Sequence, residues 1–276
     1  MDTTHIINFF LFEILLVIFF LATLGYLSFL VTKKPFLARL ATALTVVSFT
    51  LDTITILFKF TIIRISPFSN SKETLFLFIW ATILVFLIVD LKYHIPVLGA
   101  FVIPIAFMLF IYAYSLPEGK TSLPAVQSYW IGLHAVVAIL GYAVFAIASC
   151  AAVMYLIQER QLKSKKPGAL YYRLPSLEIL DNLSYQALLI GFPLLTLAII
   201  IGAIWAKFRG VNPLSRDPTT IFAIIVWIIY AILIYARVTA GWRGRKASYL
   251  TILGFSYILI TFMAIYYFSE RRLHLF

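Results

Sequence analysis

The chain has 276 residues, of which 63% are hydrophobic and only 12% charged, with 22 Lys and Arg against 11 Asp and Glu. Soluble domains are about 45–50% apolar and about 25% charged, so this composition excludes both an ordinary soluble enzyme and a disordered chain. The net charge of +11 is better explained by the basic loops of an oriented membrane protein than by nucleic-acid binding, because almost no soluble surface remains to meet DNA.

Eight apolar segments follow one another along the chain, each bounded by charged residues or by Pro and Gly. Their approximate ranges are 6–32, 40–63, 74–91, 96–115, 124–158, 184–206, 219–240 and 247–268. A membrane helix takes about 20 apolar residues, whereas barrel strands are about 10 residues long and alternate in polarity. We therefore expect an all-α, polytopic integral membrane protein with about eight transmembrane helices, surrounded by membrane lipid and forming a single domain over 1–276.

The basic residues indicate how these helices are oriented. If the segments alternate in direction, 13 Lys and Arg gather on one side and 9 on the other. The richer side is cytoplasmic by the positive-inside rule, which places both termini and the loops 64–73, 116–123 and 207–218 outside. Between the fifth and sixth segments, residues 173–183 are expected to form a short amphipathic element at the inner interface.

Few residues of this chain can carry chemistry. Cys150 is the only cysteine, which excludes an intrachain disulfide, a CxxC pair and a cysteine-based zinc site. No HExxH motif supports a zinc hydrolase. His134 lies about ten residues inside the fifth segment and His274 lies just beyond the last one, so both are expected near the outer membrane face, where imidazoles can ligate haem iron. The alternatives are an ordinary hydrogen-bonded His134 and a terminal His274 without a ligand.

Three ionisable residues, Glu13, Asp52 and Lys59, fall inside apolar segments, where charges are costly and often functional. Asp52 and Lys59 are seven residues apart and therefore share a helix face. This spacing suits a structural ion pair, a Lys59 that extends outward to the membrane interface, or a proton or substrate path. The outer loop 207–218 is short and basic. With Arg271 and Arg272 it forms a cationic rim suited to an anionic ligand such as a propionate, unless these charges are simply solvated.

Several stretches in one order resemble a known family. They are Pro67-Phe68-Ser69-Asn70, Leu98-Gly99-Ala100-Phe101-Val102, Leu133-His134, Leu180-Asp181-Asn182-Leu183-Ser184-Tyr185, Gly191-Phe192-Pro193-Leu194-Leu195-Thr196, Gly202-Ala203-Ile204-Trp205-Ala206, Asp217-Pro218 and Gly241-Trp242-Arg243-Gly244. The chain with these stretches resembles the cytochrome c assembly family of haem-handling membrane proteins (CcsA, ResC and CcmC), and especially its HemX-like branch.

The resemblance implies a multi-pass protein of the bacterial inner membrane that binds or translocates haem b in cytochrome c biogenesis. His134 and His274 match two outer histidines thought to be axial ligands of the haem iron. Trp205 and Asp217 match the loop that carries the macrocycle, and we expect Arg209 and Arg216 to contact its propionates. The implied partners are a CcsB/ResB-like membrane protein and apocytochrome c, and we expect no ligase activity from this chain alone.

The chain also departs from the family pattern. Counted without gaps from Trp205-Ala206, the three tryptophan positions of the family loop hold Gly210, Leu214 and Arg216, and Asp52 stands where members typically carry an intramembrane histidine. The alternative function is therefore a HemX-like, non-catalytic regulator or adaptor of tetrapyrrole synthesis that no longer handles haem. A small-molecule transporter that uses Asp52 and Lys59 comes last, because no inverted repeat or pair of broken helices is evident.

Overall fold

A computed structural model describes residues 3–63, 65–116, 129–164, 168, 170–208, 210 and 218–273, without the side chains of 3–9, 129, 218–219 and 263–273. The described residues form eight α-helices and no strand, which confirms the all-α prediction. The helices are α1 (Thr3–Thr32), α2 (Pro35–Phe58), α3 (Ser71–Tyr93), α4 (Gly99–Ser115), α5 (Tyr129–Lys163), α6 (Leu177–Phe208), α7 (Pro218–Thr239) and α8 (Arg245–Leu273).

Seven of these helices, α1 to α7, are long and apolar enough over their described residues to cross a membrane. The chain is therefore a multi-pass membrane protein, as its composition predicts. The eighth helix, α8, has 29 residues, about 43 Å at 1.5 Å per residue, which is also enough for a span. Its role as the eighth span stays a prediction, since its side chains are described only as far as residue 262.

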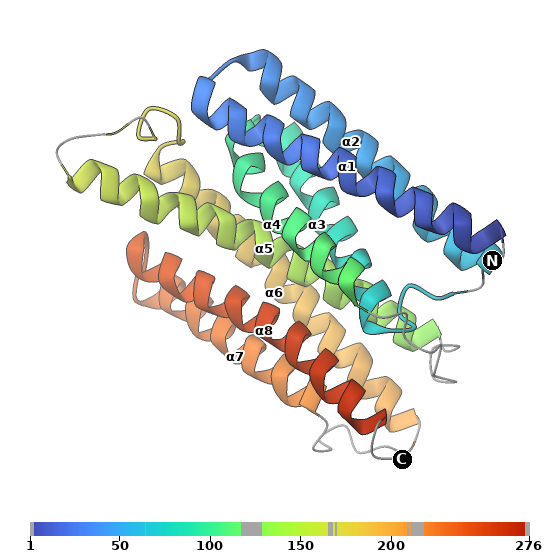
Figure 1. Ribbon diagram of the computed structural model, residues 1–276. Helices are drawn as coiled ribbons and strands as arrows, with labels where there is room; N and C mark the ends of the chain where they lie inside the picture. The colour runs from blue at the N-terminus through green and yellow to red at the C-terminus, as the bar shows by residue number, and fades with distance from the viewer. Residues whose placement is uncertain are drawn as a thin grey trace. The chain divides into compact units, whose positions relative to one another are not determined.

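The chain divides into two compact units, residues 1–122 with 164–175 and residues 123–163 with 176–276. The first unit contains α1 to α4. Figure 1 shows its first two helices side by side in opposite directions, joined by the two-residue turn Lys33-Lys34. Its core contains the clustered rings of Phe12, Phe76 and Phe110, with centroids 4.9 to 6.2 Å apart.

The second unit contains α5 to α8, and small residues let its helices approach closely. A Cβ atom built on Gly191 of α6 would lie 2.7 Å from the ring of Phe145 on α5. That ring stacks on Tyr230 of α7 with centroids 3.8 Å apart, and a Cβ on Gly254 of α8 would lie 2.8 Å from Tyr230. The four helices of this unit therefore meet around one aromatic stack.

The expected interfacial element over 173–183 is wrong as a separate element, because α6 begins at Leu177 and continues to Phe208. Neither Pro nor Gly interrupts residues 177–190, so nothing in that sequence stops the helix. Asp181 is further tied to α7 and to the start of α8, since it accepts hydrogen bonds from Arg237 and from the backbone N–H of Gly244. Residues 177–183 are therefore the first turns of the sixth span.

Contacts within each unit agree with the predicted alternation of the helices. In the first unit, the Lys33 ammonium donates to the Tyr172 carbonyl at 2.9 Å, so the loops after α1 and after α5 lie at one end. In the second unit, the Asp181 contacts join the start of α6 to the α7–α8 turn. These loops were all assigned to the basic side, which stays the predicted cytoplasmic side.

Candidate functional site

His134, the first predicted ligand, lies on α5 and packs against α6. Its Nδ1 atom is 2.6 Å from the backbone carbonyl oxygen of Ala198. A Cβ atom built on Gly202 would lie only 2.9 Å from both Nδ1 and Cε1 of the ring. The imidazole therefore occupies the space that any side chain at position 202 would need, and the contact fixes both its place and its orientation.

The hydrogen bond also determines which ring nitrogen of His134 can bind a metal. A carbonyl oxygen only accepts hydrogen bonds, so Nδ1 carries the proton. In the neutral ring the lone pair is then on Nε2. Metal-ligating histidines commonly donate their other ring N–H to a carbonyl or carboxylate, which orients the ring and makes the ligating nitrogen more basic. His134 therefore has the hydrogen-bonding arrangement of a metal or haem ligand.

Aromatic residues stand about one turn beyond His134, toward the end of α5 and α6 that is predicted to be outer. Trp205 is half-buried and lies on the same face of α6 as Ala198 and Gly202, because the spacings of four and seven residues return to one face. Trp130 precedes His134 by one turn, and its ring centroid is 6.4 Å from that of Phe208. Trp130 is not among the predicted site residues, although its i,i+4 spacing from His134 is a usable signal.

The remaining predicted site residues lie outside the described residues: Arg209, Arg216, Asp217 and His274. Of the two predicted site residues that are described, His134 packs against Gly202, and Trp205 stands one turn further along the same face of α6. Over the described residues, no group of three or more His, Cys, Asp and Glu side chains could hold a metal ion. Cys150 is a buried free thiol.

A second cluster of functional candidates lies in the first unit, around Lys59. Its ammonium donates to Glu73 Oε1 at 2.7 Å, and the two side chains are only 6% and 12% exposed. The same nitrogen lies 4.5 Å and 5.6 Å from the ring centroids of Phe12 and Phe76. Lys59 therefore does not extend to the membrane surface but is paired inside the unit.

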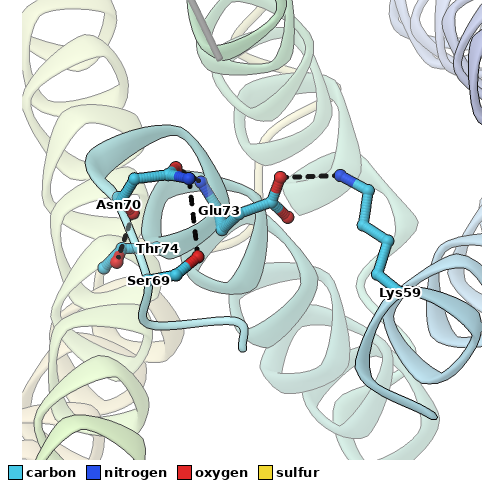
Figure 2. A network of polar contacts seen from close by, with 5 residues as sticks. All are labelled: Lys59, Ser69, Asn70, Glu73 and Thr74. Carbon is cyan, nitrogen blue, oxygen red and sulfur yellow. Dashed lines mark hydrogen bonds and ion pairs between the residues drawn. The ribbon is translucent and has the colours of Figure 1, made fainter. Parts of the chain in front are cut away.

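The partner of Lys59 is positioned by a helix cap, shown in Figure 2. Asn70 is the N-cap of α3, where its side chain accepts the backbone N–H of Glu73 at 2.9 Å, while its carbonyl accepts the Thr74 hydroxyl at 2.9 Å. An Asn three residues before a Glu is a recognisable helix start. This signal could have identified Glu73 as an ordered carboxylate, although not as the partner of Lys59.

Asp52 shares the buried face of α2 with Lys59, as the seven-residue spacing predicts. The residue is 1% exposed, and its Oδ2 atom has no hydrogen-bond partner among the described residues. Its neighbours on that face, Thr45, Ser48 and Thr55, are also buried, and their hydroxyls donate to carbonyls one turn earlier in α2. Asp52 is thus a buried carboxyl group in a polar stripe of a membrane helix.

Glu13, the third intramembrane charge, has a simpler role. It is half-buried and accepts a hydrogen bond from the Tyr114 hydroxyl at 3.0 Å, which connects α1 to α4. In the second unit, a comparable connection was not foreseen from the sequence: Asp181 on α6 pairs with Arg237 on α7, and the Arg237 guanidinium lies 4.8 Å from the ring centroid of Tyr185. Both contacts connect neighbouring helices of one unit.

Comparison with known proteins finds a family and relatives that match most of the chain. Residues 68–271 match the model of the family described as "Cytochrome C assembly protein". A cytochrome c biogenesis protein CcsA of Prochlorococcus marinus (strain MIT 9301) is 32% identical over 257 residues, which cover 84% of this chain and 82% of the relative. Proteins of the same name from Guillardia theta and Microcystis aeruginosa are 33% and 32% identical and cover 72% of this chain. The chain therefore belongs to the cytochrome c assembly protein family.

Proposed function

We propose that this protein acts in cytochrome c biogenesis by binding haem at the outer membrane face and passing it on. His134 and His274 serve as axial ligands, Arg209 and Arg216 contact the propionates, and Asp217 anchors the loop. Haem b is the cargo here, and the covalent bond to apocytochrome c is made with a CcsB/ResB-like membrane partner. The protein lies in the bacterial inner membrane, with the loop 207–218 on the outer side.

The observation that carries this proposal is the hydrogen bond from His134 Nδ1 to the Ala198 carbonyl. The contact leaves the lone pair on Nε2, which is the nitrogen that an iron ligand needs free of its proton. The family shown by residues 68–271 and the cytochrome c biogenesis proteins among the relatives support the same function.

Aromatic residues on α5 and α6 compensate in part for the tryptophans that the outer loop lacks. Trp130, Trp205 and Phe208 stand at the predicted outer ends of these helices. Stacked or edge-on aromatic pairs are each worth about 0.5–1.5 kcal/mol beyond the area they bury. These rings provide an apolar surface for a macrocycle beside the imidazole of His134.

The position of Asp52 does not fit an intramembrane haem site. A carboxylate is not the neutral imidazole that haem proteins use, and the charged neighbours of Asp52, Lys59 and Glu73, are already paired with each other. We therefore assign no haem passage to this position. The proposal is restricted to the outer site of the second unit.

An absorption spectrum of the full-length protein, purified in detergent from haem-replete cells, tests the proposal. We expect a Soret band whose intensity corresponds to about one haem per protein. This band should be lost in His134→Ala and in His274→Ala. His94→Asn is the matched control, because His94 is the C-cap of α3 with φ 53°, a conformation that Asn tolerates. A protein without haem, or single histidine variants that keep full occupancy, would contradict haem binding.

A HemX-like regulator of tetrapyrrole synthesis is the second candidate, and the tryptophan positions held by Gly210, Leu214 and Arg216 favour it. The two functions give different deletion phenotypes. Loss of c-type cytochromes at normal levels of tetrapyrrole enzymes supports the first function. Normal levels of c-type cytochromes together with altered levels of tetrapyrrole enzymes support the second function.

A further inference from the structure

A pocket of about 210 Å³ lies in the first unit, beside the end of α1. It is lined by Phe29, Leu30, Lys33, Val97, Tyr172 and Arg173, and we call it the Lys33–Arg173 pocket. Its volume is below the roughly 300–1,000 Å³ of sites for drug-sized ligands, so it fits one chemical group and not a whole cofactor. None of these six lining residues is acidic, and two are cationic.

Lys33 adopts a backbone conformation that its side chain makes unfavourable. It follows the last residue of α1 with φ 59°, in the left-handed region where glycine is usual at the end of a helix. A residue with a Cβ atom costs about 1–2 kcal/mol there relative to its ordinary conformation. Such strain at a non-glycine residue is a reason to look for a function of its side chain, and the Lys33 ammonium is at the pocket, 2.9 Å from the Tyr172 carbonyl.

Arg173 supplies the second cation and a free donor. Its Nη1 group donates to the Leu30 carbonyl at the end of α1, which fixes the guanidinium against that helix. Its Nε atom is buried and has no hydrogen-bond partner among the described residues. A buried N–H without an acceptor costs about 1–3 kcal/mol, so the guanidinium beside the pocket is not fully satisfied by the protein.

We propose that the Lys33–Arg173 pocket binds the phosphate group of an anionic phospholipid. Guanidinium and ammonium groups together recognise phosphate oxygens through charge-assisted hydrogen bonds, and basic pockets between membrane helices bind anionic headgroups in this way. The apolar side chains of Phe29, Leu30 and Val97 provide a surface for the glycerol backbone and the first acyl carbons. They distinguish a lipid from soluble phosphate, which carries the same anionic group without the apolar part.

The location of the pocket agrees with this ligand. It lies at the end of α1, where a span of 23 described residues reaches the interface, and the adjoining side chains Val31 and Phe36 are 64% and 70% exposed. Exposed apolar side chains beside a basic loop are the surroundings of a lipid headgroup at the membrane boundary. The loops that form the pocket belong to the side predicted to be cytoplasmic, where anionic lipids attract basic residues.

Native mass spectrometry of the full-length protein in a neutral detergent tests the proposal, with phosphatidylglycerol as the probe. We expect one tightly bound lipid in the wild type. In Lys33→Gly and Arg173→Gln the affinity should fall by about tenfold or more, as for the loss of one charge-assisted hydrogen bond. Lys33→Gly is informative because glycine relieves the backbone strain. Its thermal midpoint should equal or exceed that of the wild type while lipid binding is lost.

Lys34→Gln is the matched control, since it removes a neighbouring cation of the same turn that does not line the pocket. This variant should bind phosphatidylglycerol like the wild type. Equal losses in the Lys33 and Lys34 variants would overturn the proposal, because the effect would then come from net charge. Competition by inorganic phosphate at a concentration equal to that of the lipid would also overturn it, in favour of a soluble phosphate ligand.

Discussion

The Lys59–Glu73 pair permits the sharpest test of how the first unit is stabilised. In Lys59→Met, the Glu73 carboxylate stays 88% buried. It loses Lys59, its one ion-pair partner among the described residues. Breaking a buried pair by removing one partner costs about 3–5 kcal/mol. The new methionine keeps the contacts with Phe12 and Phe76, where sulfur packs well against rings, so this cost comes mainly from the unpaired carboxylate.

The double variant Lys59→Met with Glu73→Gln removes both charges and keeps the Asn70 cap, which uses only the backbone N–H of Glu73. Replacing both partners of a buried pair is often neutral or stabilising. We therefore expect the double variant to recover most of the stability lost in the single one. The coupling free energy from the double-mutant cycle should be about 2–4 kcal/mol, compared with the roughly 0.5–3 kcal/mol range of residues in contact.

Reversible unfolding in mixed micelles, followed by circular dichroism, measures these free energies. The matched control is the Lys163–Glu159 pair on α5, at 2.6 Å, in which the lysine side chain is 63% exposed. Exposed i,i+4 pairs contribute about 0.3–0.5 kcal/mol, so Lys163→Met should change little. A loss below about 1 kcal/mol in Lys59→Met, or a double variant as unstable as the sum of the singles, would refute the reasoning from burial.

Three further variants test the second unit. Gly202→Leu should lower haem occupancy about tenfold or more, because the new side chain displaces the His134 ring. Ala203→Leu, at an exposed position, is the control and should keep the wild-type occupancy. Equal absorption spectra for the two variants would contradict this. Asp181→Asn should lower the free energy of unfolding by about 3–5 kcal/mol, because it leaves the Arg237 guanidinium, only 5% exposed, without its ion-pair partner. Glu178→Gln, at an exposed position of the same helix, should lower it by less than about 0.5 kcal/mol. Gly244→Ala should lower the thermal midpoint, because the new Cβ atom clashes with the Tyr155 hydroxyl and because φ is 62° there. Adding Tyr155→Phe should restore part of the loss by removing the clash. A double variant without any recovery would mean that the backbone conformation alone is responsible.

The sequence predicts the helices well because lipid leaves few alternatives to them. The sequence does not predict which residues of different helices pair with each other. The seven-residue spacing correctly places Asp52 and Lys59 on one face, but the ion pair of Lys59 is with Glu73 across the α2–α3 connection. Spacing along one helix carries no information about which residue of another helix is opposite. The same holds for Asp181, which meets Arg237 56 residues later in the sequence.

Boundaries were less predictable than spans for a related reason. Hydropathy marks where a helix enters the apolar layer, whereas hydrogen bonds and caps decide where it begins. Pro35 begins α2 as its first residue, five residues before the apolar segment that starts at 40, since proline suits this position. Leu177 begins α6 seven residues before the predicted span at 184. In both cases turns that contain charged residues extend the helix beyond the apolar segment.

The two departures from the family pattern have different physical consequences. Asp52 is buried within the first unit, in a polar stripe of α2 that also contains Lys59, and Lys59 is paired with Glu73. The lost tryptophans belong to the second unit, where Trp130, Trp205 and Phe208 still offer aromatic surface near His134. His134 keeps its tautomer through a backbone carbonyl, which does not depend on either departure. Under the proposed function, the outer site in the second unit needs no ligand from the first unit, because the Lys59–Glu73 and Asp181–Arg237 pairs each form within one unit.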